Sequence, residues 1–70
     1  MLIALGKSQL EKGHFDKALS SFEKAILIDK KNPDLWNLKG IALRSLGRYN
    51  EAIDCFNSSL QLDPRDKNSS

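Results

Sequence analysis

The sequence predicts an all-α fold built from two helix-turn-helix hairpins, which makes four antiparallel helices. The first observation behind this prediction is an internal repeat, because shifting the 70-residue chain by 34 positions brings five identical residues into register. The matching pairs are Gly6 with Gly40, Gly13 with Gly47, Ala18 with Ala52, Phe22 with Phe56 and Asp29 with Asp63. A period of this length is typical of stacked helical hairpins.

The second observation is helical spacing inside each copy. In the second copy Trp36, Gly40 and Leu43 recur at intervals of four and three residues, which places them on one face of a helix that Gly47 ends. Another apolar stripe at helical spacing follows this glycine directly. Each repeat unit is therefore predicted to be a helix, a short turn and a second helix.

The first two helices are bounded by a glycine and a proline. We expect the first helix to end at Gly13 in a left-handed conformation, and the second to run from near Asp16 until the Asn32-Pro33 step, where the residue before proline is pushed out of the helical region. The second helix is predicted to bury a stripe of apolar residues against the first. This stripe comprises Phe15, Ala18, Leu19, Phe22, Ala25, Ile26 and Ile28.

Pro33 and Asp34 suit the first turn of the third helix, and Asn50 is predicted to cap the fourth. Pro64 is expected to stop the fourth helix. The corresponding organisation is one tandem-repeat domain, 1–66, followed by a disordered polar tail. The first repeat spans 1–32, the second spans 33–66 and the tail spans 67–70.

Gly40 lies inside a predicted helix, where glycine costs about 0.5–1 kcal/mol relative to alanine. A packing reason is therefore expected. We predict that Gly40 and Ala52 allow two helices to approach almost backbone to backbone while Tyr49 and Phe56 fill the flanks, and that the first copy does the same.

The pattern W-x3-G-x2-L-x3-G-x-Y-x2-A-x3-F-x7-P, from Trp36 to Pro64, resembles the tetratricopeptide repeat family. Ser59 and Lys39 depart from the family's usual alanine and leucine. In the first copy Leu2 stands at the position of Trp36. The resemblance implies a short right-handed α-solenoid whose first helices line a concave groove that binds a peptide or partner segment, in the manner of a scaffold.

The composition argues against nucleic-acid binding, a disulfide, a metal site and a membrane span. Eleven Lys or Arg residues against nine Asp or Glu leave a net charge of +2, and these charges are scattered, so we expect no nucleic-acid partner. The single cysteine excludes an internal disulfide, and no Cys or His spacing indicates a metal site or other cofactor. The opening apolar run is too short for a signal peptide or a membrane span. A cytoplasmic protein without a membrane partner is expected.

No residue pattern indicates catalysis. His14 is interpreted as a solvated turn residue and Cys55 as a partly buried filler, because neither has an oriented partner. Trp36 and Tyr49 could stack on a ligand, but their positions favour a packing role. We therefore predict no catalytic residues and no enzyme activity.

Two binding surfaces are predicted. The concave groove combines an apolar strip with polar flanks and suits a segment that carries a carboxylate. Its candidate residues are Ile3, Lys7, Leu10, Glu11, Asn37, Leu38, Ile41, Arg44 and Ser45. An equal alternative is that Leu10, Leu38 and Ile41 only pack one repeat on the next.

The second surface is the fourth helix, where Ile53, Phe56, Leu60 and Leu62 lack the third repeat that would cover them. The alternative function is therefore self-association, as a homo-oligomer formed by stacking or by hairpin swapping, in a fragment of a longer array or a minimal module. RNA binding is a minor alternative, since related helical repeats read bases.

Overall fold

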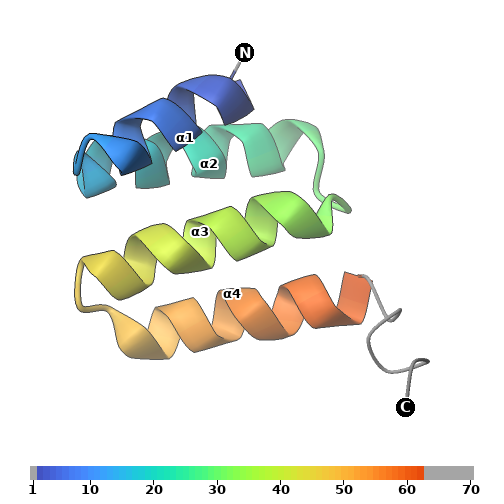
Figure 1. Ribbon diagram of the computed structural model, residues 1–70. Helices are drawn as coiled ribbons and strands as arrows, with labels where there is room; N and C mark the ends of the chain where they lie inside the picture. Colours follow the sequence, from blue (N-terminus) through green and yellow to red (C-terminus); the bar gives the residue numbers. More distant parts are fainter. Residues whose placement is uncertain (1, 63–70) are drawn as a thin grey trace.

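The computed structural model describes residues 2–62, and within this range all regular structure is helical (Figure 1). The helices are α1 (Leu2–Glu11), α2 (Phe15–Ile28), α3 (Pro33–Ser45) and α4 (Tyr49–Leu62). Each helix packs against the next in the chain, and α1 also touches α3. Two adjacent helical hairpins, α1 with α2 and α3 with α4, confirm the predicted all-α architecture.

The turns inside both hairpins depend on glycine. Gly13 and Gly47 have the same positive φ of 83°, which confirms the left-handed conformation predicted for the end of the first helix. After each glycine the chain donates back to the helix, from His14 N to Gln9 O (2.8 Å) and from Arg48 N to Leu43 O (2.9 Å). These bonds use carbonyl groups that a helix end leaves free.

The start of α3 also agrees with the sequence, since Pro33 is its first residue and the Oδ1 atom of Asn32 accepts a hydrogen bond from Asp34 N (3.0 Å). The predicted cap of α4 is wrong. This helix begins at Tyr49, and the carbonyl of Arg48 accepts the first helical bond from Ala52 N (3.0 Å). Asn50 therefore lies in the first turn. The predicted stop at Pro64 and the polar tail lie outside the described residues.

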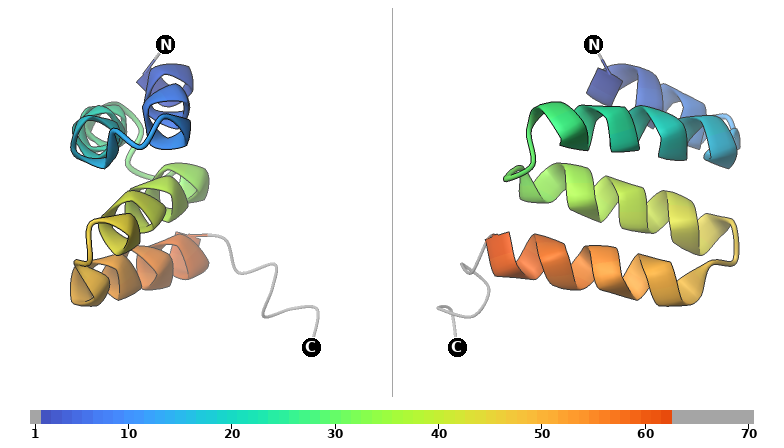
Figure 2. Two further views of the ribbon diagram at one scale, coloured as in Figure 1. Left: turned by 60° about the vertical axis from the view of Figure 1, so that its left-hand side comes forward. Right: turned by 180° about the vertical axis from the view of Figure 1, so that it is seen from behind.

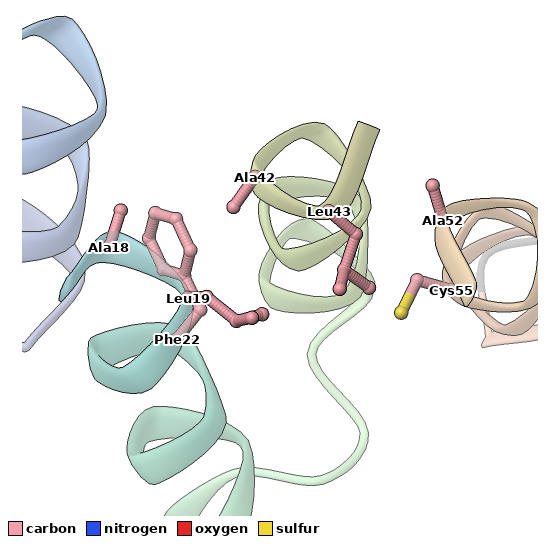
Figure 3. Packing of buried hydrophobic residues seen from close by; sticks show 7 residues of the cluster. All are labelled: Ala18, Leu19, Phe22, Ala42, Leu43, Ala52 and Cys55. Carbon is pink, nitrogen blue, oxygen red and sulfur yellow. The ribbon is translucent and has the colours of Figure 1, made fainter. Parts of the chain in front are cut away.

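The largest buried cluster joins both hairpins through α3 (Figure 3). Side chains of α2, α3 and α4 meet there in a row, with Leu43 between Leu19 and Cys55. The full cluster is Ala18, Leu19, Phe22, Ala42, Leu43, Ala52 and Cys55. A smaller cluster of Ala25, Ile26 and Leu35 lies where α2 meets the start of α3. The core is thus shared between the repeats.

The helix glycines make room for an aromatic ring, which corrects the predicted backbone-to-backbone contact. A Cβ atom added at Gly40 would lie 2.6 Å from Cε1 of Phe56, and one added at Gly6 would collide with the ring of Phe22. In each hairpin the phenylalanine of the second helix therefore lies over the glycine of the first. This contact explains why a helix tolerates glycine here.

Two residues predicted to pack inside are exposed. Ile28 is 79% exposed, because it lies two residues after the buried Ile26 and so points to the far side of the helix. Tyr49 is 63% exposed. Its counterpart Phe15 is partly buried and shares a small hollow with Leu46 of the following repeat, a neighbour that Tyr49 lacks among the described residues.

The two hairpins follow one another along the molecule, and Figure 2 shows α1 and α2 together at one end, α3 next to them and α4 at the other end. Helix α2 is covered on both sides, by α1 and by α3, whereas α4, within residues 2–62, packs mainly against α3. Among the described residues, no helix has the length and apolar character that crossing a membrane requires.

Candidate partner-binding surfaces

A hollow of about 310 Å³ lies between α1 and the first turns of α3. We call it the α1–α3 hollow. Its lining combines two aliphatic side chains with four polar or charged ones. The lining residues are Ile3, Lys7, Asn32, Asp34, Asn37 and Leu38.

The α1–α3 hollow brings together four of the nine predicted groove residues, namely Ile3, Lys7, Asn37 and Leu38. The other five do not line it. Glu11, Arg44 and Ser45 are exposed, Ile41 is partly buried and Leu10 packs against the large core cluster.

The aliphatic members of the hollow also serve the fold. Ile3 packs against the small cluster of Ala25, Ile26 and Leu35, and Leu38 packs against the large one. For Leu10 and Leu38, the packing role that was the alternative in the sequence is therefore observed. Lys7 and Asn37 are exposed polar residues and do not contribute to either core cluster.

Sequence reasoning missed Asn32 and Asp34 as lining residues. The Asn-Pro-Asp sequence signalled a helix start, and that same start projects both side chains toward α1. The lining thus includes the carboxylate of Asp34 as well as the ammonium of Lys7. A bound segment would therefore meet both signs of charge, which differs from the simple carboxylate preference expected from the sequence.

The second predicted surface lies on α4. Ile53 is 54% exposed and Leu60 is 41% exposed, and Leu62 is also exposed. Phe56 differs from these three, because its ring packs over Gly40 and against the large core cluster and is only partly exposed. The apolar part of α4 that faces solvent is thus formed mainly by Ile53 and Leu60.

Cys55 and His14, the two residues considered for catalysis, lie in surroundings that do not activate them. Burial raises the pKa of the Cys55 thiol, so the thiolate needed for nucleophilic attack is disfavoured. His14 is exposed immediately before α2 and its side chain makes no capping bond. Within residues 2–62 no cluster of His, Cys, Asp and Glu side chains could hold a metal ion.

One exposed ion pair marks the start of α4. Arg48 donates from Nε and Nη2 to the carboxylate of Glu51 at 2.6 and 2.7 Å. These hydrogen bonds lower the pKa of Glu51. Because both groups are fully exposed, the pair orients two side chains and adds little to stability.

Comparison with known proteins decides the family. Residues 2–32 and residues 33–66 each match the tetratricopeptide repeat. The chain belongs to the tetratricopeptide repeat family. Proteins of this family are generally protein-interaction modules and typically lack catalytic activity.

Relatives of the chain come from distant organisms. An uncharacterised protein of Methanocaldococcus jannaschii is 46% identical over 52 residues, which is 74% of this chain and 60% of the relative. The peroxisomal targeting signal receptor of Saccharomyces cerevisiae is 34% identical over 89% of this chain and 10% of its own length. The BBSome complex member BBS4 of Bos taurus is 36% identical over 89% of this chain and 12% of its own length. The similarity therefore concerns a repeat segment of these proteins.

Proposed function

We propose that this tetratricopeptide repeat pair is a non-catalytic interaction module that holds a segment of a partner protein in the α1–α3 hollow. The observation that carries the proposal is the meeting of exposed Lys7 and Asn37 with aliphatic Ile3 and Leu38 in that hollow. An aliphatic side chain of the partner would contact Ile3 and Leu38, while its polar groups would bond to the flanking residues.

Peptide selection tests this proposal. Random twelve-residue peptides displayed on phage are selected on the purified chain, and the selected peptides are measured by calorimetry against the Lys7→Glu and Asn37→Ala variants. We expect binding to weaken by roughly tenfold in Lys7→Glu, because an exposed charge reverses beside the ligand. Lys24→Glu makes the same charge change on the exposed side of α2 and is the control. Peptides that bind all variants equally would refute the proposal.

Self-association through α4 is the second candidate, and the exposure of Ile53 and Leu60 supports it. A second copy, a swapped hairpin or a further repeat would each remove this surface from water. The hydrophobic effect favours such a contact in proportion to the apolar area it buries.

Molar mass measured by light scattering behind size exclusion, over about a hundredfold range of concentration, tests this candidate. We expect a dimer or larger species that becomes a monomer in the Ile53→Glu, Leu60→Glu double variant. Ile28→Glu replaces an even more exposed aliphatic residue on α2 and should leave the mass unchanged. A monomer at every concentration would exclude self-association.

A further inference from the structure

A second concave region lies on the opposite face of α3 from the α1–α3 hollow. Helix α3 packs against both α2 and α4 and so separates them. Two adjoining hollows share Glu23, Trp36 and Lys39: a wider one of about 440 Å³ between α2 and α3, and a narrower one of about 220 Å³ that reaches α4. We call them together the α2–α4 groove. Trp36, Lys39 and Leu43 of α3 form its floor, between Glu23 and Leu27 of α2 and Asp54 of α4.

The floor residues belong to a different face of α3 than the residues of the α1–α3 hollow. Trp36, Lys39 and Leu43 are spaced by three and four, whereas Asp34, Asn37 and Leu38 lie roughly half a turn away at 3.6 residues per turn. A ligand in the α2–α4 groove would therefore touch Trp36, and a ligand in the α1–α3 hollow would not.

The narrower hollow is acidic although the whole chain has a net charge of +2. Glu23, Glu51 and Asp54 line it, with Lys39 as its one basic residue. The ammonium of Lys39 lies 3.7 Å from the Glu23 carboxylate and 5.4 Å from the centre of the Trp36 ring, so it offsets Glu23 first. Glu51 is already paired with Arg48, so Asp54, which makes no ion pair within residues 2–62, is the lining carboxylate left for a ligand.

The chemistry of Cys55 agrees with this charge pattern. Burial is the main cause of the raised pKa of its thiol, and the carboxylates of Asp54, Glu51 and Glu23 raise it further while only Lys39 lowers it.

The wider hollow is apolar. Leu27 is 72% exposed and lies beside Trp36 and the buried Ile26. The indole of Trp36 is held in place because Nε1 donates to the carbonyl of Lys30 (2.9 Å). An exposed leucine beside a fixed indole offers a preformed contact for one aliphatic side chain.

We propose that the α2–α4 groove binds a short basic segment of a partner protein. An aliphatic side chain of this segment packs against Leu27 and Trp36, and an arginine or lysine a few residues away reaches Asp54. The acidic side chains favour a positively charged segment, and the apolar hollow provides most of the contact area. This surface is separate from the one in the proposed function and operates whether or not the α1–α3 hollow is occupied.

Trp36 is the single tryptophan and lines the α2–α4 groove but not the α1–α3 hollow, so its fluorescence and its indole N–H signal in NMR report on ligands in this groove. The probe is a nine-residue peptide that alternates leucine and arginine. One comparison peptide has glutamate in place of arginine, and another has alanine in place of leucine. We expect the leucine-arginine peptide to shift the Trp36 signals saturably, and each comparison peptide to bind at least roughly tenfold more weakly.

Variants separate the groove from general charge attraction. Asp54→Lys, at an exposed position, should weaken the leucine-arginine peptide by roughly tenfold, while Glu11→Lys makes the same charge change on α1 and should leave binding within about twofold. Lys7→Glu, which tests the α1–α3 hollow, should not weaken binding of the leucine-arginine peptide. Equal loss in Asp54→Lys and Glu11→Lys, or an unchanged Trp36 signal at millimolar peptide, would overturn the proposal. So would a rise of molar mass that Asp54→Lys abolishes, since a second copy would then occupy the groove.

Discussion

Helices α2 and α4 occupy equivalent places in the two repeats but differ in what covers them. Leu19 and Ile26 of α2 are each 7% exposed, whereas Ile53 and Leu60, 34 residues later, are 54% and 41% exposed. Phe22 is completely buried and Phe56 only partly. The sequences of the two helices are similar at these positions, so the difference arises from α3, which packs on α2 and has no described counterpart beyond α4.

This contrast shows where the stability of the chain resides. A single hairpin buries its Gly-Phe contact, but it leaves half of its second helix exposed. The next repeat removes a further part of that helix from water, including Leu19 and Ile26, and apolar burial stabilises in proportion to the area removed. Equivalent substitutions in α2 and α4 should therefore lower the free energy of unfolding by unequal amounts.

The largest effect is expected at the two phenylalanines. Phe22→Ala should lower the free energy of unfolding by about 3–5 kcal/mol, because it empties a completely buried site between α1, α2 and α3. Phe56→Ala should cost about 1–2 kcal/mol less, because part of its ring is already in water. Urea denaturation followed by circular dichroism measures both. Equal losses would mean that α4 is covered in solution.

Leu19→Ala and Ile53→Ala give the sharpest matched pair. The first should cost about 2–5 kcal/mol and the second about 0.5 kcal/mol or less, since one side chain is buried and the other is on the surface. Thermal melts at low and at high protein concentration check this. A cost for Ile53→Ala that grows with concentration would favour self-association through α4.

Gly40→Leu tests the contact that the two hairpins share. The new side chain would have to displace the ring of Phe56, because its Cβ would lie 2.6 Å from Cε1 of that ring. Overpacking of this kind costs about 1–3 kcal/mol or more. Ser45→Leu introduces the same side chain at an exposed position of α3 and is the control. An unchanged melting temperature in Gly40→Leu would contradict the observed packing.

Ser59→Ala tests a hydrogen bond that the second repeat makes and the first repeat lacks. Ser59 Oγ donates to the carbonyl of Pro33 (2.9 Å) and ties α4 to the start of α3, a bond that Ala25 at the equivalent position of α2 cannot make. Its loss should cost about 1 kcal/mol or less. Asn57→Ala, an exposed neighbour, should be close to neutral. A stability equal to that of the original chain would show that the bond contributes nothing.

The smallest effect concerns pH. Because the pKa of Cys55 is raised in the folded chain, its contribution to stability is complete below the ordinary thiol pKa of about 8.5 and is lost as pH rises through the folded value. Denaturation curves at pH 7.5 and 10 should show a larger loss for the original chain than for Cys55→Ala. Equal losses would mean that the thiol is not protected by the fold.

Most local structure could be predicted from the sequence. Gly13, Gly47 and the Asn32-Pro33-Asp34 start act through the backbone of a few adjacent residues, so their effect is readable without knowing the fold. The start of α4 was missed, because Asn50 is a common capping residue and nothing local shows that the helix begins one residue earlier. The candidate hollow was predicted in part, through Lys7, Asn37 and two aliphatic residues, while Asn32 and Asp34 join it only because α1 lies beside the start of α3.

By itself, the sequence determined the 34-residue period, the four helices and the glycine turn inside each hairpin, whereas the contact of a phenylalanine ring with the helix glycine appeared only in the folded chain. Tertiary structure alone decided which of two equivalent residues is buried. It exposed Tyr49 while partly covering Phe15, and it placed Glu23, Trp36 and Lys39 from two helices in one groove. The physical reason is that helix formation depends on neighbours within one turn of chain, whereas burial depends on the surface that a separate repeat presents.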